Sequence, residues 1–174
     1  MTNDSSSRDG STLLPGLAVC NHARHDSDTS PLTGDLFTAI DHVGVAVPDL
    51  DAAIAFYETT YGMRLTHQEV NEEQGVREAM MAVGDSGSCI QLLAPLNDDS
   101  TIAKFLDRSG PGIQQMAYRV TDLDAVSATL RERGLRLLYD EPRCGTAESR
   151  INFVHPKDAG GILVELVEPA NNPH

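Results

Sequence analysis

Four polar residues that could bind a metal ion or move a proton occupy matching places in two similar parts of the chain. Residues 40–52 recur in degenerate form as residues 113–125, and residues 90–95 recur as residues 164–169. This repeat aligns His42 with Gln115, and Gln91 with Glu165. Imidazole nitrogens and carbonyl or carboxylate oxygens are ligands of divalent cations. We therefore expect one metal site to which each part contributes two ligands.

The elements that must position these residues repeat as well. Asp49 is suited to cap the start of a helix that ends near Gly62, and Asp122 and Gly134 bracket a second helix in the same way. A short apolar or β-branched run precedes each helix and three follow it, which predicts the pattern β-α-β-β-β for each unit. The runs after the helices are residues 63–67, 76–83 and 88–94 in the first unit, and 135–139, 150–155 and 161–167 in the second.

Each unit has around 70 residues, which is too few to bury much apolar surface alone. The two units, about 38–95 and 112–169, should therefore pack together as one α+β domain over residues 36–170. We expect curved mixed or antiparallel sheets with the metal site in the cleft. Residues 1–35 contain many Ser, Gly and Pro residues and no hydrophobic period, so we expect a disordered N-terminal tail there, and a short tail at residues 171–174.

The surroundings of the four candidate ligands favour a buried site. Because side chains alternate along a strand, His42 shares a face with Gly44 and Ala46, and these small residues leave room above the imidazole. Gln91 and Glu165 lie within apolar runs, where an unpaired polar or charged group is costly to bury. A bound cation would compensate that cost. Each residue alone is ordinarily structural or solvated, so the argument rests on the four equivalent positions together.

The paired units resemble the vicinal oxygen chelate superfamily (glyoxalase/bleomycin resistance-like) and, more finely, the methylmalonyl-CoA epimerase family. The resemblance extends over about residues 40–169, and its most specific stretches are residues 73–78, 94–100, 138–142 and 150–157. It implies an isomerase of propionate metabolism that interconverts (2R)- and (2S)-methylmalonyl-CoA by metal-assisted removal of the C2 proton, through an enolate that is then reprotonated. It also implies a CoA thioester substrate and a homodimer.

Similarity of fold alone does not assign a reaction. Two other functions therefore stay open: a different metal-dependent lyase or isomerase of the superfamily, such as a glyoxalase I, and a metal-free protein that binds a small molecule. Turnover of a glutathione hemithioacetal would favour the first, and stoichiometric binding without metal or turnover would favour the second.

One segment departs from the family pattern. Where the resemblance implies Gly-(Ile/Leu)-His-His, residues 112–115 read Gly-Ile-Gln-Gln, so Gln115 stands in place of a histidine ligand. Gln115 can still coordinate through its carbonyl oxygen, which gives a set of one nitrogen and three oxygens. This set favours harder cations, and we expect Co(II), with Mn(II), Mg(II) or Zn(II) as alternatives. The opposing interpretation is that the chain has lost the metal.

Two glutamates are the candidates for proton transfer. Glu78 alternates with Val76 and Met80 on one face of its strand, and an apolar setting would raise its pKa toward the working pH. The resemblance places a catalytic glutamate at this same position, and it gives Glu165 a double role as metal ligand and acid/base partner. The alternative for Glu78 is a solvated strand residue.

The net charge of −13 limits the partners that the protein can have. It argues against nucleic acid, and it repels an anionic CoA thioester unless positive charge is local. The candidates for contacts with the substrate's phosphates or carboxylate are Lys104, Arg143, Arg150 and Lys157, although each alone could be a surface charge. Neither a membrane-spanning run nor a secretory signal is present in the sequence, so we expect a cytoplasmic protein without membrane contact.

Overall fold

The computed structural model describes residues 34–170, which form one eight-stranded sheet with helices packed against it. The expected tails, residues 1–35 and 171–174, lie outside the described residues apart from Gly34 and Asp35. The helices are α1 (Leu50–Tyr61), α2 (Thr101–Ser109) and α3 (Leu123–Glu132), with short 3-10 turns η1 (Thr146–Glu148) and η2 (Pro156–Asp158). The strands are β1 (Ala39–Ala46), β2 (Arg64–Asn71), β3 (Val76–Ala82), β4 (Cys89–Pro95), β5 (Gly112–Arg119), β6 (Arg143–Cys144), β7 (Arg150–Val154) and β8 (Leu163–Glu168).

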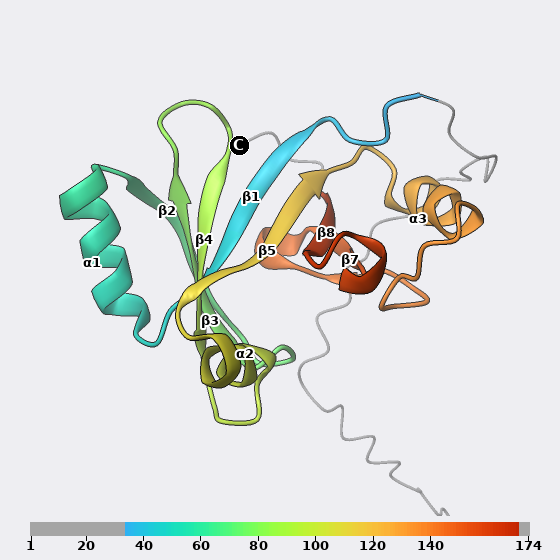
Figure 1. Ribbon diagram of the computed structural model, residues 1–174. Helices are drawn as coiled ribbons and strands as arrows, with labels where there is room; N and C mark the ends of the chain where they lie inside the picture. Colours follow the sequence, from blue (N-terminus) through green and yellow to red (C-terminus); the bar gives the residue numbers. More distant parts are fainter. Residues whose placement is uncertain (1–33, 171–174) are drawn as a thin grey trace, which may run out of the picture.

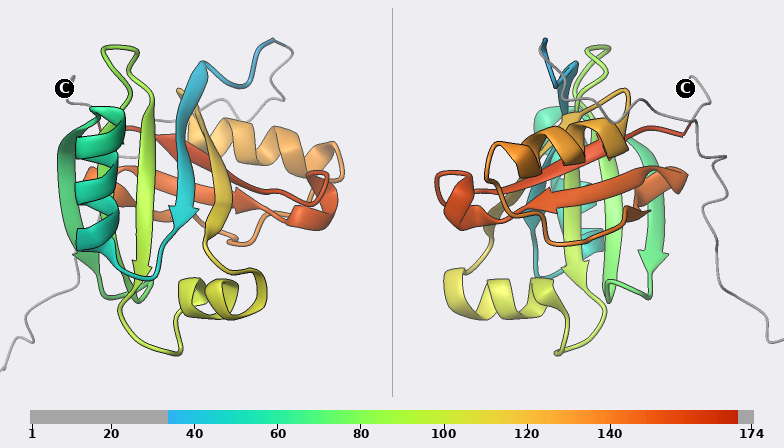
Figure 2. Two further views of the ribbon diagram at one scale, coloured as in Figure 1. Left: turned by 60° about the vertical axis from the view of Figure 1, so that its left-hand side comes forward. Right: turned by 90° about the vertical axis from the view of Figure 1, so that its right-hand side faces the viewer.

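The strand order is β2-β3-β4-β1-β5-β8-β7-β6, so that β1 and β5 join the two halves at the centre of the sheet. β1 is parallel to β4 and β5 is parallel to β8, whereas the other neighbouring strands are antiparallel. Figure 2 shows β7 and β8 running across the direction of β3 and β4, which means that the sheet curls strongly from one half to the other. This curved, mixed sheet confirms the predicted fold class.

The two predicted helices begin at the residues suited to cap them. Asp49 accepts a hydrogen bond from the backbone N–H of Ala52 at 3.0 Å, and Asp122 accepts one from Ala125 at 2.9 Å. Gly62 ends α1 with a φ of 65°, a left-handed conformation that glycine adopts without steric cost. α1 and α3 lie at opposite ends of the sheet (Figure 1).

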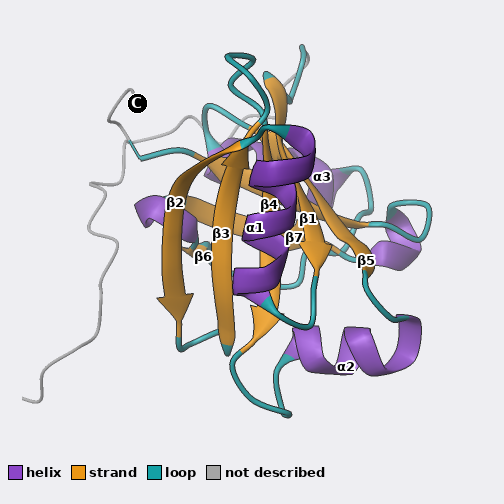
Figure 3. Ribbon diagram, turned by 90° about the vertical axis from the view of Figure 1, so that its left-hand side faces the viewer, coloured by secondary structure: helices purple, strands orange, loops and turns teal. Residues whose placement is uncertain are grey.

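Apolar side chains hold each of these helices against its half of the sheet. Leu50 and Ile54 of α1 belong to one buried cluster with Leu92, and Val126 of α3 belongs to another with Leu166. Burying a side chain of this size stabilises the fold by roughly 1.5–3 kcal/mol. Figure 3 shows α1 in front of the strands of the first half and running roughly along them. The two helices cover one face of the sheet, so the opposite face is left for the polar residues discussed below.

The helix α2, between the two units, was not predicted. It begins at Ser100, whose hydroxyl accepts a hydrogen bond from the N–H of Ala103 at 3.1 Å. Ile102 lies in a buried cluster with Val76 and Leu93, on the sheet face that α1 and α3 leave uncovered. None of the helices in residues 34–170 has both the length and the apolar character needed to span a membrane.

The strand predicted at residues 135–139 is reduced to a short antiparallel contact with β7, in which Leu138 N–H donates to the Phe153 carbonyl and His155 N–H to the Arg136 carbonyl, both at 2.8 Å. Leu137 makes an isolated bridge to Val154, and Leu135 and Leu137 instead pack beside the apolar cluster under α3. The side chain of Asn152 binds both backbone groups of Tyr139, at 3.2 Å to its N–H and 2.9 Å to its carbonyl oxygen. The leucines of this stretch therefore cover the apolar core between α3 and the sheet, and backbone pairing is limited to its middle residues.

Candidate active site

The four candidate metal ligands lie on four adjacent strands at the centre of the sheet. Their order across it is Gln91 on β4, His42 on β1, Gln115 on β5 and Glu165 on β8. Gly44 is paired with Gln91 on one side and Gln115 on the other, and Ala117 is paired with both His42 and Glu165. Register partners share a face of a sheet, so all four side chains project to the same side with small residues between them.

The polar ends of these side chains meet in a buried cluster. His42 Nε2 lies 3.1 Å from Glu165 Oε2, and Gln115 Nε2 lies 3.3 Å from Gln91 Oε1 and also donates to Glu165. None of the four residues is more than 7% exposed. The fold therefore brings together the four side chains that the repeat aligned, and their role as metal ligands stays a prediction.

The imidazole of His42 is held from behind by Asp41. His42 Nδ1 donates to Asp41 Oδ1 at 2.9 Å, and Asp41 accepts a second hydrogen bond from Arg119 Nε at 2.8 Å. Ligating histidines commonly donate their other ring nitrogen to a carboxylate in this way. Burial lowers the pKa of His42, but hydrogen bonds to Asp41 and Glu165 outweigh it and raise that pKa to about 9. A cation at Nε2 would replace a proton, so metal binding should release one.

The amide of Gln91 presents its oxygen to the cluster. Gln91 Nε2 donates to Glu78 Oε2 at 2.9 Å and to Thr146 Oγ1 at 3.0 Å, which leaves Oε1 facing Gln115. Gln115 can offer its own oxygen to the centre if its amide group rotates by half a turn.

This donor set, with one imidazole, one carboxylate and two amide oxygens, fits a divalent cation. Within residues 34–170, no three His, Cys, Asp or Glu side chains are grouped so that they could hold a metal. A metal site at the centre of the sheet therefore depends on the two glutamines as well as on His42 and Glu165.

Glu78 lies on β3, next to Gln91, and is 3% exposed. Its Oε1 accepts a hydrogen bond from the hydroxyl of Thr146 at 2.8 Å. Burial, helped by the carboxylates of Glu69 and Glu165, raises the pKa of Glu78 to about 8, while the Thr146 hydroxyl acts in the opposite direction. The carboxyl group can therefore gain and lose a proton close to neutral pH, as acid/base catalysis requires.

Two cavities open from the cluster. The first, of about 450 Å³, reaches Lys104 on α2 and Arg143 on β6, and the second, of about 1010 Å³, extends past His67. Glu165 and Thr146 line both cavities. A ligand in the first cavity would therefore contact the cluster from one side, while the second cavity gives the same cluster a separate opening.

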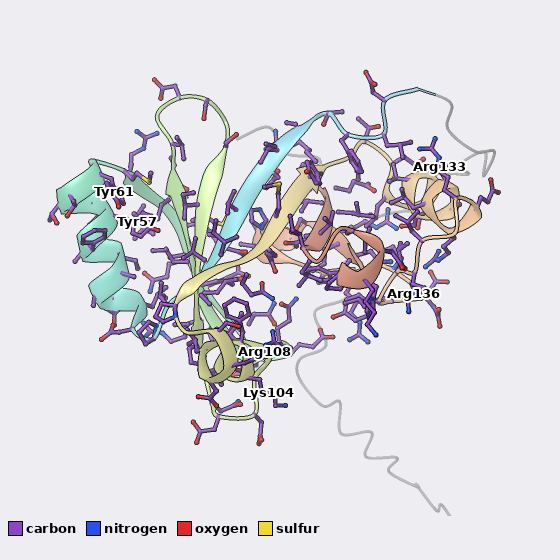
Figure 4. The ribbon with its side chains drawn as sticks, in the orientation of Figure 1. Tyr57, Tyr61, Lys104, Arg108, Arg133 and Arg136 are labelled. Carbon is purple, nitrogen blue, oxygen red and sulfur yellow. The ribbon has the colours of Figure 1, made fainter. Side chains whose placement is uncertain are left out.

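Two of the four predicted cationic contacts, Lys104 and Arg143, line the first cavity. Figure 4 shows Lys104 and its neighbour Arg108 on α2, well away from Arg133 and Arg136 beside α3. The guanidinium of Arg143 lies 4.4 Å from the centre of the Tyr139 ring. The carboxylates of Glu72, Glu73 and Asp99 line the same cavity, so Lys104 and Arg143 bring positive charge to a lining that is acidic overall.

The other two predicted contacts, Arg150 and Lys157, line neither cavity. Arg150 Nη2 donates to Asp124 Oδ2 at 2.8 Å and Nη1 donates to Glu168 Oε2 at 3.0 Å. Glu168 also accepts from the backbone N–H of Leu123, the first residue of α3. The arginine therefore ties α3 to β7 and β8. Lys157 lies in η2.

Sequence reasoning missed Thr146, which touches both Glu78 and Gln91. Nothing in its immediate sequence marks it as functional except the preceding Gly145. A Cβ atom at Gly145 would come within 2.5 Å of the Ile151 side chain, so a larger residue could stand here only if Ile151 moved. Sequence reasoning also did not pair Glu69 with His67, which lie on β2 beside Glu78 of β3.

Comparisons with known proteins agree with this architecture. Residues 41–153 match the family model described as Glyoxalase/Bleomycin resistance protein/Dioxygenase superfamily. The chain is 38% identical over 129 residues to the ethylmalonyl-CoA/methylmalonyl-CoA epimerase of Cereibacter sphaeroides, which covers 73% of this chain and 95% of that protein.

Solved structures give the same result. The methylmalonyl-CoA epimerase of Mycobacterium tuberculosis is 58% identical, with a TM-score of 0.77 over 83% of this chain and 96% of that one. A methylmalonyl-CoA epimerase in complex with methylmalonyl-CoA and NH4+ is 50% identical, with a TM-score of 0.75 over 78% of this chain and 96% of that one. The chain therefore belongs to the glyoxalase/bleomycin resistance protein/dioxygenase superfamily and, within it, to the methylmalonyl-CoA epimerases.

Proposed function

We propose that this protein interconverts (2R)- and (2S)-methylmalonyl-CoA by removing the C2 proton from one face of the substrate and delivering a proton to the other. Membership of the epimerase family supports this proposal, as does the relative whose structure holds methylmalonyl-CoA. The observation that carries it is the pair of buried carboxyl groups, Glu78 and Glu165, on either side of one polar cluster.

The sheet order puts the two carboxyl groups on opposite sides of β1. Across β3-β4-β1-β5-β8, Glu78 stands on the first strand and Glu165 on the last. Glu78 contacts the cluster through Gln91, and Glu165 contacts it through His42 and Gln115. Inversion at C2 needs one acid/base group on each face of the enolate. Carboxyl groups that approach one centre from two sides meet that requirement.

Each residue of the cluster then has a distinct task. Glu78 takes the C2 proton of one isomer or supplies it to the other, and Glu165 does the same on the opposite face. Thr146 holds Oε1 of Glu78 in place, and Gln91 holds Oε2. Burial of the cluster excludes water, so that the reacting proton is exchanged with these groups.

We propose that His42, Gln91, Gln115 and Glu165 hold a divalent cation, and we expect this cation to be Co(II). When bound, it supplies Lewis-acid stabilisation to the negative charge that develops on the substrate oxygens. The Asp41 carboxylate behind His42 and the hydrogen bonds that orient Gln91 support this ligand set.

For the CoA portion, we propose that the thioester enters by the first cavity, where Lys104 and Arg143 meet its phosphates or carboxylate. Arg143 is already paired with Glu73 at 2.6 Å, so Lys104 is the stronger candidate for a phosphate contact. Arg150 and Lys157 stay as weaker proposals. Family resemblance is the support for a homodimer and for a cytoplasmic location, and light scattering of the purified protein would test the dimer.

The deciding experiment follows deuterium incorporation at C2 of methylmalonyl-CoA in heavy water. The protein is first treated with a chelator, and Co(II), Mn(II), Mg(II) or Zn(II) is then added back. We expect exchange and epimerisation that depend on the added metal, with Co(II) the most effective. The absence of exchange with every metal would overturn the proposed function, and stoichiometric substrate binding in that case would favour the metal-free binding protein.

A further inference from the structure

Glu69 and His67 on β2 continue a row of neighbouring polar side chains that starts at Glu78 on β3. Glu69 is the register partner of Glu78 on the neighbouring strand, so the two carboxyl groups lie side by side on one face of the sheet. His67 Nε2 lies 2.5 Å from Glu69 Oε2. The chain therefore passes from Glu78 to Glu69 and then to the imidazole of His67. The site described above uses neither of these two residues.

Exposure to solvent increases along this chain. Glu78 is 3% exposed, whereas the side chains of Glu69 and His67 are 29% and 39% exposed. β2 is the edge strand of the sheet, and His67 lines the second cavity. Lys104 and Arg143 line the first cavity instead. The chain of side chains thus leads out of the site by a different opening from the one proposed for the substrate.

The backbone beside Glu69 is strained in a way that supports this arrangement. Ala147 and Glu148 both have left-handed conformations, with φ of 53° and 60°, which residues with a side chain rarely adopt. In this conformation the N–H of Ala147 points at Glu69 Oε2, at 3.3 Å. The neighbouring Thr146 at the same time donates to Glu78. One short turn therefore holds both carboxyl groups of the chain.

Epimerisation creates a need for such a path. When Glu78 removes the C2 proton and the opposite group supplies the new one, Glu78 ends the turnover with one proton more and its partner with one proton fewer. The enzyme regains its starting state only after the extra proton leaves Glu78 for solvent and Glu165, which lines both cavities, takes a proton up from solvent. Glu78 is buried, so this transfer needs intervening groups that both accept and donate a proton.

We propose that Glu69 and His67 form the relay by which Glu78 exchanges protons with solvent during turnover, an inference that rests on the proposed epimerase function. The proton passes from a Glu78 oxygen to Glu69, from Glu69 Oε2 to Nε2 of His67, and the imidazolium then releases its Nδ1 proton to water or buffer. Glu78 and Glu69 return to their original states, and His67 does so once its ring has exchanged the remaining proton from Nε2 to Nδ1 through water; no bond other than those to protons changes. For the opposite isomer, the same steps run in reverse.

The test compares His67→Ala and Glu69→Gln with the control variant Gln68→Ala, all loaded with the same metal. Gln68 is the exposed residue between the two, on the other face of β2. In heavy water, we expect the His67 and Glu69 variants to return the original proton to C2 more often, so that recovered substrate holds at least threefold less deuterium per epimerisation event than with wild type. We also expect kcat of His67→Ala to fall about tenfold at low buffer concentration, with KM unchanged.

Added imidazole is the second readout, because a small base can replace a missing imidazole in proton transfer but cannot repair a damaged fold. We expect imidazole to restore most of the kcat lost by His67→Ala and to leave wild type and Gln68→Ala unchanged. Wild-type exchange ratios in both relay variants would overturn the relay and leave the epimerase function standing. A loss of kcat that imidazole does not restore, with unchanged exchange ratios, would also overturn it. If wild type itself exchanges no deuterium, the proposed function fails and the relay fails with it.

Discussion

Replacement of Glu78 by Gln should remove activity and increase stability at the same time. Gln keeps the size of the side chain and retains one acceptor oxygen, but it cannot take up the C2 proton. A positioned acid/base group typically contributes about 10²–10⁴-fold to a rate. We therefore expect epimerisation to fall by roughly this factor, which corresponds to about 3–5 kcal/mol of transition-state free energy. Metal content should stay that of wild type.

The expected gain in stability follows from the pKa of Glu78, which is raised from 4.5 to about 8 in the metal-free fold. The folded protein favours the protonated carboxyl, so its contribution to stability is present in full below pH 4.5 and is lost as the pH rises through about 8. At pH 7 the loss is on the order of 3 kcal/mol, since each pKa unit corresponds to about 1.4 kcal/mol. Gln does not ionise and should avoid this loss.

Thermal unfolding in the presence of a chelator measures the effect. We expect wild type and Glu78→Gln to unfold at similar temperatures near pH 4.5, and the variant to unfold roughly 6–12 °C higher at pH 7. The matched control is Glu58→Gln, at an exposed position of α1. Wild-type epimerase activity in Glu78→Gln would refute the assigned role, and a stability difference that does not grow with pH would refute the account of its burial.

Two further substitutions test the ligand cluster and the predicted cationic contacts. Gly44→Ala places a Cβ atom 2.5 Å from Gln115 Cγ, so we expect metal affinity to fall by roughly 10–100-fold in a metal titration. The control is Gly112→Ala, which has open space around its Cβ and should leave metal affinity unchanged. Equal metal affinity in the two variants would contradict the ligand role of Gln115. Arg150→Ala removes the guanidinium that pairs with Asp124 and Glu168, and it should lower the free energy of unfolding by about 2 kcal/mol while KM stays unchanged. The control is Arg64→Ala, at an exposed position, which should change stability little. A raised KM without a loss of stability would instead support contact of Arg150 with CoA.

The helix caps, the run at residues 135–139 and Arg150 show why some predictions from the sequence succeeded and others did not. Capping at Asp49 and Asp122 was readable because a helix N-terminus needs a nearby side-chain acceptor, which is a local requirement. The apolar run at residues 135–139 had the composition of a strand, but packing under α3 decided its conformation. Arg150 looked like a free cation, and its pairing with Asp124 depends on where α3 lies against the sheet.

The sequence by itself determined the duplicated frame and the four positions aligned in the centre of the sheet, because a repeat and a period-2 alternation are properties of the chain alone. Tertiary structure decided what surrounds them. A shift in register between β1 and β5 brings Gln114 to the first cavity beside Gln115, although simple alternation would place the two on opposite faces. The contact of Glu78 with Glu69 and with Thr146 likewise depends on strand register and on a loop from the other half. Such contacts join residues distant in sequence, and only the folded sheet brings them together.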